Sequence, residues 1–97
     1  MANKYIIIIN EVITDNQLKN FTDVLTSNYV NIKGGSNIYL VMTDDNVNPK
    51  SIYKIISEKT NMEFSFIVIE FNNWYGNLYT KAFDWLTEKF PNTKIIE

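Results

Sequence analysis

Apolar residues along the chain fall into short β-branched and aromatic runs, separated by polar segments in which apolar residues recur at helical spacing. The short runs favour β-strands, because branched and aromatic side chains pack well on a pleated surface. These runs are Lys4–Val12, Tyr29–Lys33, Asn37–Met42 and Glu63–Phe71. Between the second and third runs, Gly34-Gly35-Ser36 predicts a hairpin turn. A phosphate-binding loop is disfavoured, since its glycines would open a helix, whereas these lead into a strand.

The segments at helical spacing carry recognisable start and stop signals. Thr14 and Gln17 have the spacing of a capping box, and Asn48 followed by Pro49 is a strong signal for a helix start. Pro91 ends the last helical pattern. The predicted helices span Asp15–Asn28, Pro49 to about Thr60, and about Asn77 to Phe90. The apolar positions of the third helix are Leu78, Ala82, Phe83, Trp85, Leu86 and Phe90.

The order of these elements predicts the fold class. It runs strand, helix, strand, strand, helix, strand, and then a further helix. With right-handed crossovers this order gives the ferredoxin-like arrangement, in which two helices cover one face of an antiparallel sheet. Thr93–Ile96 is a candidate for a short fifth strand. We therefore predict a single α+β domain over residues 1–97, with ferredoxin-like βαββαβ topology and an added C-terminal helix.

Alternation along the predicted strands places apolar side chains on both faces of the sheet. In the first strand the odd-numbered residues 5–9 point to one face, and Ile6 and Ile8 point to the other. An antiparallel sheet with one wet face normally alternates apolar with polar residues, so both faces of this sheet need a cover. At about 25 cal/mol per Å² of apolar surface, an uncovered second face would forgo several kcal/mol. The cover is either the helix Asn77–Phe90 or a second copy, and we expect a homodimer.

Aromatic residues around the loop after the last strand are candidates for an interface. Such side chains often anchor contacts between proteins. Aromatic residues near a strand end also commonly fold back into the core, and stacking on nucleic-acid bases is a less favoured third role. The candidate interface residues are Phe71, Trp74, Tyr75 and Trp85.

Composition excludes several classes of chemistry. The 97 residues include no cysteine and no histidine, which removes disulfides, thiolate nucleophiles, imidazole catalysis and the usual zinc sites. All 9 basic residues are lysines and the net charge is −2. Nucleic-acid binding is therefore disfavoured, although a local lysine patch stays compatible with it. No run is apolar enough to cross a membrane and no secretory signal is present, so we expect a cytoplasmic protein without a cofactor.

Several segments together resemble a known family. They are Tyr5–Asn10, Ser36–Thr43, Pro49–Ile52, Phe64–Glu70 and Ala82–Leu86. As a set they are similar to the small ferredoxin-fold proteins related to the CRISPR adaptation nuclease subunit, in particular its SinR-like branch. The resemblance covers most of the chain before Pro91. It implies a ferredoxin-like and usually homodimeric protein, in a family where divalent-metal nuclease activity is claimed for some members and absent from others.

The resemblance places the metal-binding aspartate of that family at Asn10, at the end of the first strand. A neutral amide is a poor replacement for a carboxylate that binds a hard cation, and the neighbouring Glu11 points to the opposite face of the strand. Asp44 and Asp45 are further candidate metal ligands, together with Glu11 and Asp15. Their strands are antiparallel neighbours, so the ends that carry these residues lie at opposite edges of the sheet. We therefore predict no catalytic residue and no metal site.

These observations favour a non-enzymatic, dimeric interaction or regulatory module that acts by binding a protein partner. The small size, the acidity and the resemblance are compatible with a role in phage–host defence. The alternatives are a metal-dependent nuclease like the resembled family and a nucleic-acid-binding module without catalysis.

Overall fold

Three helices and a four-stranded antiparallel sheet form the part of the chain that the computed structural model describes, residues 3–43, 47–61, 64–72 and 78–89. In chain order the elements are β1 (Asn3–Ile9), α1 (Asp15–Asn28), β2 (Val30–Gly35), β3 (Ile38–Thr43), α2 (Pro49–Thr60), β4 (Phe66–Phe71) and α3 (Thr80–Lys89). The predicted α+β class, and the predicted order of helices and strands within these residues, are confirmed.

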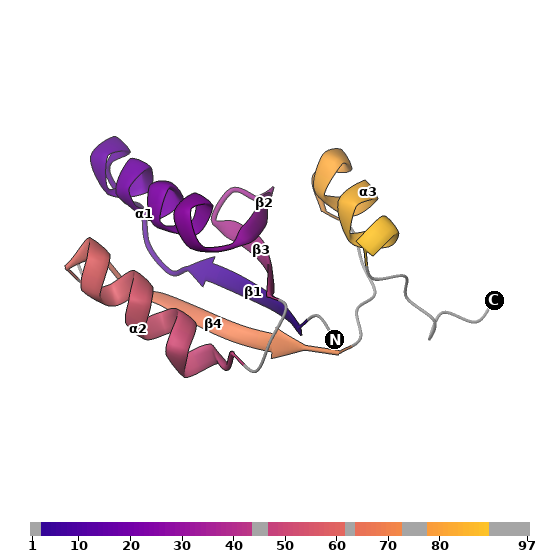
Figure 1. Ribbon diagram of the computed structural model, residues 1–97. Helices are drawn as coiled ribbons and strands as arrows, with labels where there is room; N and C mark the ends of the chain where they lie inside the picture. Colours follow the sequence, from indigo (N-terminus) through magenta and orange to yellow (C-terminus); the bar gives the residue numbers. More distant parts are fainter. Residues whose placement is uncertain (1–2, 44–46, 62–63, 73–77, 90–97) are drawn as a thin grey trace.

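The sheet is the middle layer of the molecule. Its strands lie in the order β2-β3-β1-β4, and each neighbouring pair is antiparallel. Strands β1 and β3 are therefore central, while β2 and β4 form the two edges. Helices α1 and α2 cover one face of the sheet, and α3 lies on the side of the opposite face (Figure 1).

Strand β1 shows why the sheet needs helices on both sides. Its residues alternate between buried and half-buried along the strand. Tyr5, Ile7 and Ile9 point toward α1 and α2 and have at most 2% of their surface exposed. Ile6 and Ile8 point to the other face and are half-buried. The alternation predicted from the sequence is thus the alternation that the sheet adopts.

The main core is centred on an aromatic side chain of α1. Phe21 is fully buried, and its ring meets those of Tyr39, Phe64 and Phe66 at steep angles, with centroid distances of 5.1, 5.8 and 6.3 Å. Edge-to-face pairs at such distances are favourable beyond the apolar area they bury. One side chain therefore joins α1 to β3, to β4 and to the residues just before β4.

Helices α1 and α2 begin where the sequence predicts. The Gln17 amide donates to the Thr14 hydroxyl oxygen at 3.1 Å, and the Thr14 amide donates to Gln17 Oε1 at 2.9 Å, which completes the capping box. The Ser51 amide donates to Asn48 Oδ1 at 2.8 Å, and Pro49 occupies the first turn of α2. These bonds satisfy amide groups that have no partner within the helix.

The prediction of a first strand that reaches Val12 is wrong, because β1 ends at Ile9. The Glu11 side chain makes a contact with β4's preceding residue at this point. Its Oε2 accepts a hydrogen bond from the backbone amide of Ser65 at 2.6 Å, in place of the carbonyl that would continue the ladder. Val12 then lies outside the sheet with 94% of its surface exposed.

Other predicted boundaries shift by a few residues or lie outside the described part of the chain. Strand β4 begins at Phe66, after the predicted start at Glu63, which itself lies outside the described residues. Helix α3 begins at Thr80. The predicted end of that helix at Phe90 and the candidate fifth strand Thr93–Ile96 also lie outside the described residues.

Truncation of Phe21 tests the main core. Phe21→Ala removes the ring that connects three other aromatic side chains, and we expect the free energy of unfolding to fall by about 3–5 kcal/mol. Urea denaturation followed by circular dichroism measures the change. The control is Val12→Ala, which should stay within about 0.5 kcal/mol of the wild type. Similar losses in both variants would contradict a core centred on Phe21.

Candidate functional site

Helix α3 covers one half of the second sheet face. Ala82 and Leu86 of α3 pack with Leu40 of β3, and each of the three has at most 3% of its surface exposed. The Tyr79 amide donates to the carbonyl of Gly34 at 3.1 Å, which ties the residue before α3 to β2. Helix α3 therefore lies over the β2–β3 half of this face.

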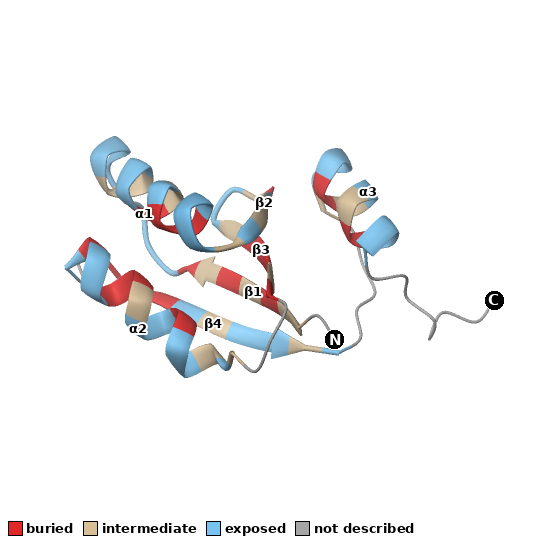
Figure 2. Ribbon diagram, viewed as in Figure 1, coloured by how far each residue is buried: buried red, intermediate tan, exposed pale blue. Residues whose placement is uncertain are grey.

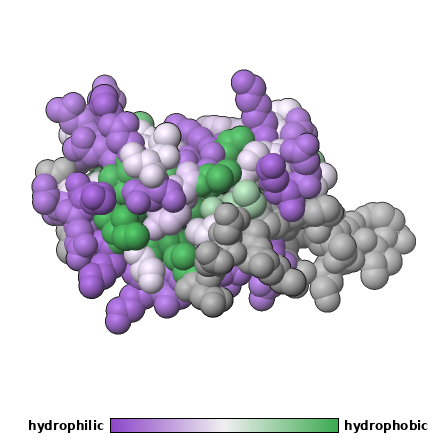
Figure 3. Space-filling view, viewed as in Figure 1, coloured by the Kyte–Doolittle hydropathy of each residue, from purple (hydrophilic) through white to green (hydrophobic). Residues whose placement is uncertain are grey.

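The half of the face over β1 and β4 exposes apolar side chains. Ile67 and Ile69 of β4 are 51% and 40% exposed. The register places Ile67 beside Ile8 and Ile69 beside Ile6. We call these four isoleucines the open apolar patch; Ile67 and Ile69 are its exposed members, whereas Ile6 and Ile8 are half-buried and Ile6 also packs against the cluster of Leu40, Ala82 and Leu86. Figure 2 shows much of β4 in the colour of exposed residues, in contrast to β1 beside it. Figure 3 shows that hydrophobic side chains reach the surface between hydrophilic ones.

A shallow groove runs along β4 on the other face of the sheet, beside α2. Its volume is about 250 Å³, and its lining residues are Pro49, Lys50, Tyr53, Phe66, Ile67 and Val68. The ring of Tyr53 stacks on that of Phe66 at a centroid distance of 4.7 Å and is 38% exposed. Strand β4 therefore carries apolar surface on both faces, with an exposed cation, Lys50, on the α2 side.

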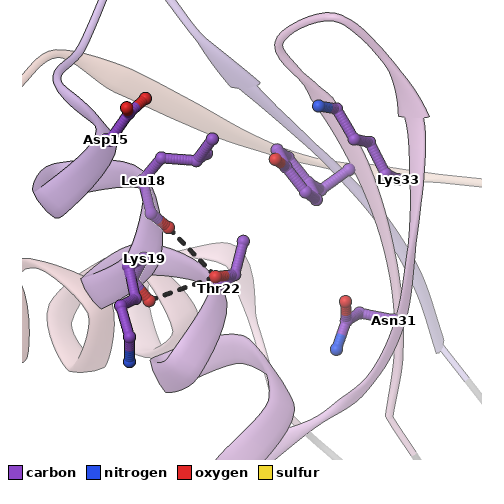
Figure 4. Close-up of a pocket in the computed structure, with 7 residues that line it drawn as sticks. Asp15, Leu18, Lys19, Thr22, Asn31 and Lys33 are labelled. Carbon is purple, nitrogen blue, oxygen red and sulfur yellow. Dashed lines mark hydrogen bonds between the residues drawn. The ribbon is translucent and has the colours of Figure 1, made fainter.

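A second groove lies between α1 and the β2–β3 hairpin, with a volume of about 500 Å³ (Figure 4). Several of its charged and polar groups have partners within the protein. Lys19 pairs with Asp23 at 2.9 Å, and the Thr22 hydroxyl donates to the carbonyl of Leu18 at 3.0 Å. Lys33 Nζ lies 6.0 Å from the ring centroid of Tyr39. Burial, with a smaller contribution from Tyr79, raises the pKa of Tyr39 above its ordinary value.

The residues considered for metal binding do not assemble into a site. Asn10 is exposed, and its backbone amide donates to the carbonyl of Ser65 at 2.8 Å. Glu11 is engaged by the Ser65 amide, and Asp15 lies in the first turn of α1. Asp44 and Asp45 lie outside the described residues. Among the described residues, no three acidic, histidine or cysteine side chains lie close enough together to hold a metal ion.

The strand register agrees with the prediction that the ends of β1 and β3 lie apart. Thr43, the last residue of β3, pairs with Asn3, the first residue of β1. The last residue of β1 and the last residue of β3 therefore lie at opposite ends of the β1–β3 ladder.

The predicted interface aromatics divide into two groups. Phe71 and Trp85 are half-buried and pack against the cluster that α3 forms on β3. Trp74 and Tyr75 lie outside the described residues. The surface that β4 presents instead consists of Ile67, Ile69 and the groove beside Tyr53. Alternation identified the isoleucines as one face of a strand, but it did not show which half of the face α3 leaves open.

Comparison with protein-family models, curated proteins and solved structures finds no match to this chain. Within the described residues, no helix combines the length and the apolar character needed to cross a membrane.

The Glu11 contact predicts a structural role for this carboxylate. Glu11→Ala should lower the free energy of unfolding by about 1–2 kcal/mol, because the hydrogen bond to the Ser65 amide has an ionised acceptor. Glu11→Gln should recover part of the loss, since its amide oxygen can accept the same bond. Urea denaturation measures both, and Glu58→Ala, at an exposed residue of α2, is the control. If the stability of the wild type in urea depended on magnesium, this would contradict a purely structural role for Glu11.

Proposed function

We propose that this protein is a non-enzymatic, homodimeric interaction module, which binds proteins through the surface formed by β4. The open apolar patch carries this proposal. Isolated exposed hydrophobic residues are ordinary on protein surfaces, but contiguous apolar patches often mark sites of protein contact. Ile67 and Ile69 are adjacent on one face of an edge strand and continue into Ile6 and Ile8.

The energetics favour a protein as the occupant of this surface. Complete burial of an isoleucine side chain is worth about 1.5–3 kcal/mol, so each half-exposed isoleucine of β4 leaves about 1 kcal/mol unrealised. In a two-fold symmetric dimer the same patch is buried twice. Four such side chains would then contribute several kcal/mol, a useful part of the binding free energy of a dimer.

The proposal includes a ferredoxin-like arrangement for the domain. The strand order β2-β3-β1-β4, its antiparallel pairing and the position of α1 and α2 on one face support it. The fold by itself does not define a function. A binding role is favoured over a nuclease because Asn10 stands where the resembled family carries its metal-binding aspartate, and because Glu11 holds the backbone of Ser65.

Introducing negative charge on the open face tests the proposal. The wild type should sediment as a dimer at micromolar concentration, and Ile67→Glu/Ile69→Glu should sediment as a folded monomer, since the dimer would bury unpaired carboxylates. The control is Val12→Glu, which adds one carboxylate at a more exposed apolar residue outside the sheet and should remain dimeric. Analytical ultracentrifugation measures the mass, and circular dichroism checks the fold. A wild type that stays monomeric at these concentrations would overturn the homodimer.

Plasmid degradation separates the binding module from the nuclease alternative. We expect no cleavage by the wild type in the presence of magnesium, because the described residues hold no carboxylate cluster. Magnesium-dependent cleavage that Glu11→Ala abolishes would favour the nuclease and overturn the non-enzymatic role. Cleavage that Glu11→Ala leaves unchanged would point to a contaminating enzyme.

A further inference from the structure

The two edges of the sheet differ in how well they are protected against pairing with another strand. Edge strands are commonly protected by lysines, by irregular pairing or by a covering element. Strand β2 has such features: Lys33 is exposed, the register shifts between Lys33 and Gly35, and Gly34 binds the residue before α3. Strand β4 reads F-I-V-I-E-F, without lysine, proline or glycine, and pairs with β1 in unbroken register.

The hydrogen bonds fix which backbone groups of β4 point outward. The Asn10 amide donates to the Ser65 carbonyl, so Asn10 and Ser65 occupy the position of a hydrogen-bonded pair just beyond the end of β1, where the Ser65 amide donates to Glu11 instead. Such pairs alternate along an antiparallel ladder. The amides and carbonyls of Ile67, Ile69 and Phe71 therefore point toward β1. Those of Phe66, Val68 and Glu70 point to the outer edge, where no described strand pairs with β4.

We propose that the homodimer forms by antiparallel pairing of β4 with β4 of a second copy, with Val68 opposite Val68 on the two-fold axis. This inference rests on the proposed homodimer and specifies its geometry. In this register Phe66 lies opposite Glu70 of the other copy, so every residue with outward backbone groups forms a hydrogen-bonded pair. Shifting the register by two residues would leave part of the edge unpaired. The two sheets become one continuous sheet of eight strands.

The same register joins the open apolar patches of the two copies. Ile67 lies opposite Ile69 of the second copy at a non-hydrogen-bonded position, where side chains across the strands are closest. Since Ile67 also lies beside Ile8, and Ile69 beside Ile6, the isoleucines form continuous rows across the dimer axis. The exposed isoleucines thus gain the neighbours that they lack in a single copy.

Charge complementarity on the face that α2 covers favours a second copy of the chain as the partner that pairs with β4. Glu70 of one copy lies opposite Phe66 of the other, whose ring stacks on Tyr53 in the groove that Lys50 also lines. The pairing therefore brings each exposed carboxylate of Glu70 to a groove that carries an exposed ammonium group. By symmetry this contact forms twice. An unrelated apolar strand would form the ladder without meeting this charge requirement.

A single cysteine tests the register directly, because the chain has no cysteine of its own. Residues in a hydrogen-bonded antiparallel pair have Cα atoms about 5.5 Å apart, within the range that a disulfide can bridge. Val68→Cys should therefore form a disulfide-linked dimer under oxidised glutathione. The control is Glu70→Cys on the same strand and face, whose symmetry-related Cα atoms would be about 14 Å apart. We expect at least about tenfold more linked dimer from Val68→Cys.

A charge exchange tests the register with the fold and the backbone unchanged. Glu70→Lys and Lys50→Glu should each weaken dimerisation by about two- to fivefold, because like charges then meet in the groove. Lys50→Glu/Glu70→Lys should restore the affinity of the wild type. The dissociation constant from ultracentrifugation is the readout. Weakening by both single variants without recovery in the double variant would contradict the Glu70–Lys50 contact and the register.

These experiments separate failure of this geometry from failure of the proposed function. A monomeric wild type overturns the homodimer and the geometry together. A dimer that ultracentrifugation detects, but that Val68→Cys does not link more than Glu70→Cys does, overturns edge pairing alone and leaves a dimer formed by stacked faces or by another segment. Linkage by both variants to the same extent also overturns the register, since it would reflect random collisions.

Discussion

The burial of β1 from both sides determines the arrangement of the other elements. Its odd-numbered residues are covered by α1 and α2, but Ile6 and Ile8 require apolar contacts on the opposite face. One helix cannot supply all of them. A helix with its side chains is about 10 Å across, whereas four strands spaced about 4.8 Å apart form a wider surface. Helix α3 lies over β2 and β3; Ile6 and Phe71 reach its cluster, but Ile67 and Ile69 of β4 stay exposed.

Local signals in the sequence predicted much of the fold. Thr14 and Asn48 define helix starts through contacts within three residues, and such contacts can be read from spacing alone. The side chains that share a face of each strand could be predicted for a similar reason, because successive side chains of a pleated strand point to opposite faces. The early end of β1 could not be read in this way. It coincides with a bond between Glu11 and Ser65, whose separation in sequence is 54 residues.

The candidate site was predicted only in outline. The excess of apolar residues on the second face was evident from the sequence, and it led to the expectation of a second copy. Phe71 and Trp85 were selected because aromatic residues commonly anchor interfaces, and both are half-buried against the cluster of Leu40, Ala82 and Leu86. Ile67 and Ile69 carry the exposed surface instead. Their exposure depends on which strands α3 covers, and a hydrophobic pattern identifies apolar positions without saying where an added helix docks.

The irregular pairing of β2 has a consequence for the size of any assembly. A sheet with two unprotected edge strands could add copies indefinitely, as in a fibril. Here the register shift near Gly35 and the attachment of the residue before α3 hinder pairing at the β2 edge, so among the described strands of the proposed dimer only the β4 edge joins copies. In the proposed dimer the two β4 edges pair with one another, and no second unprotected strand edge is left among the described residues. The shift of one residue in a hairpin thereby sets a finite limit on growth.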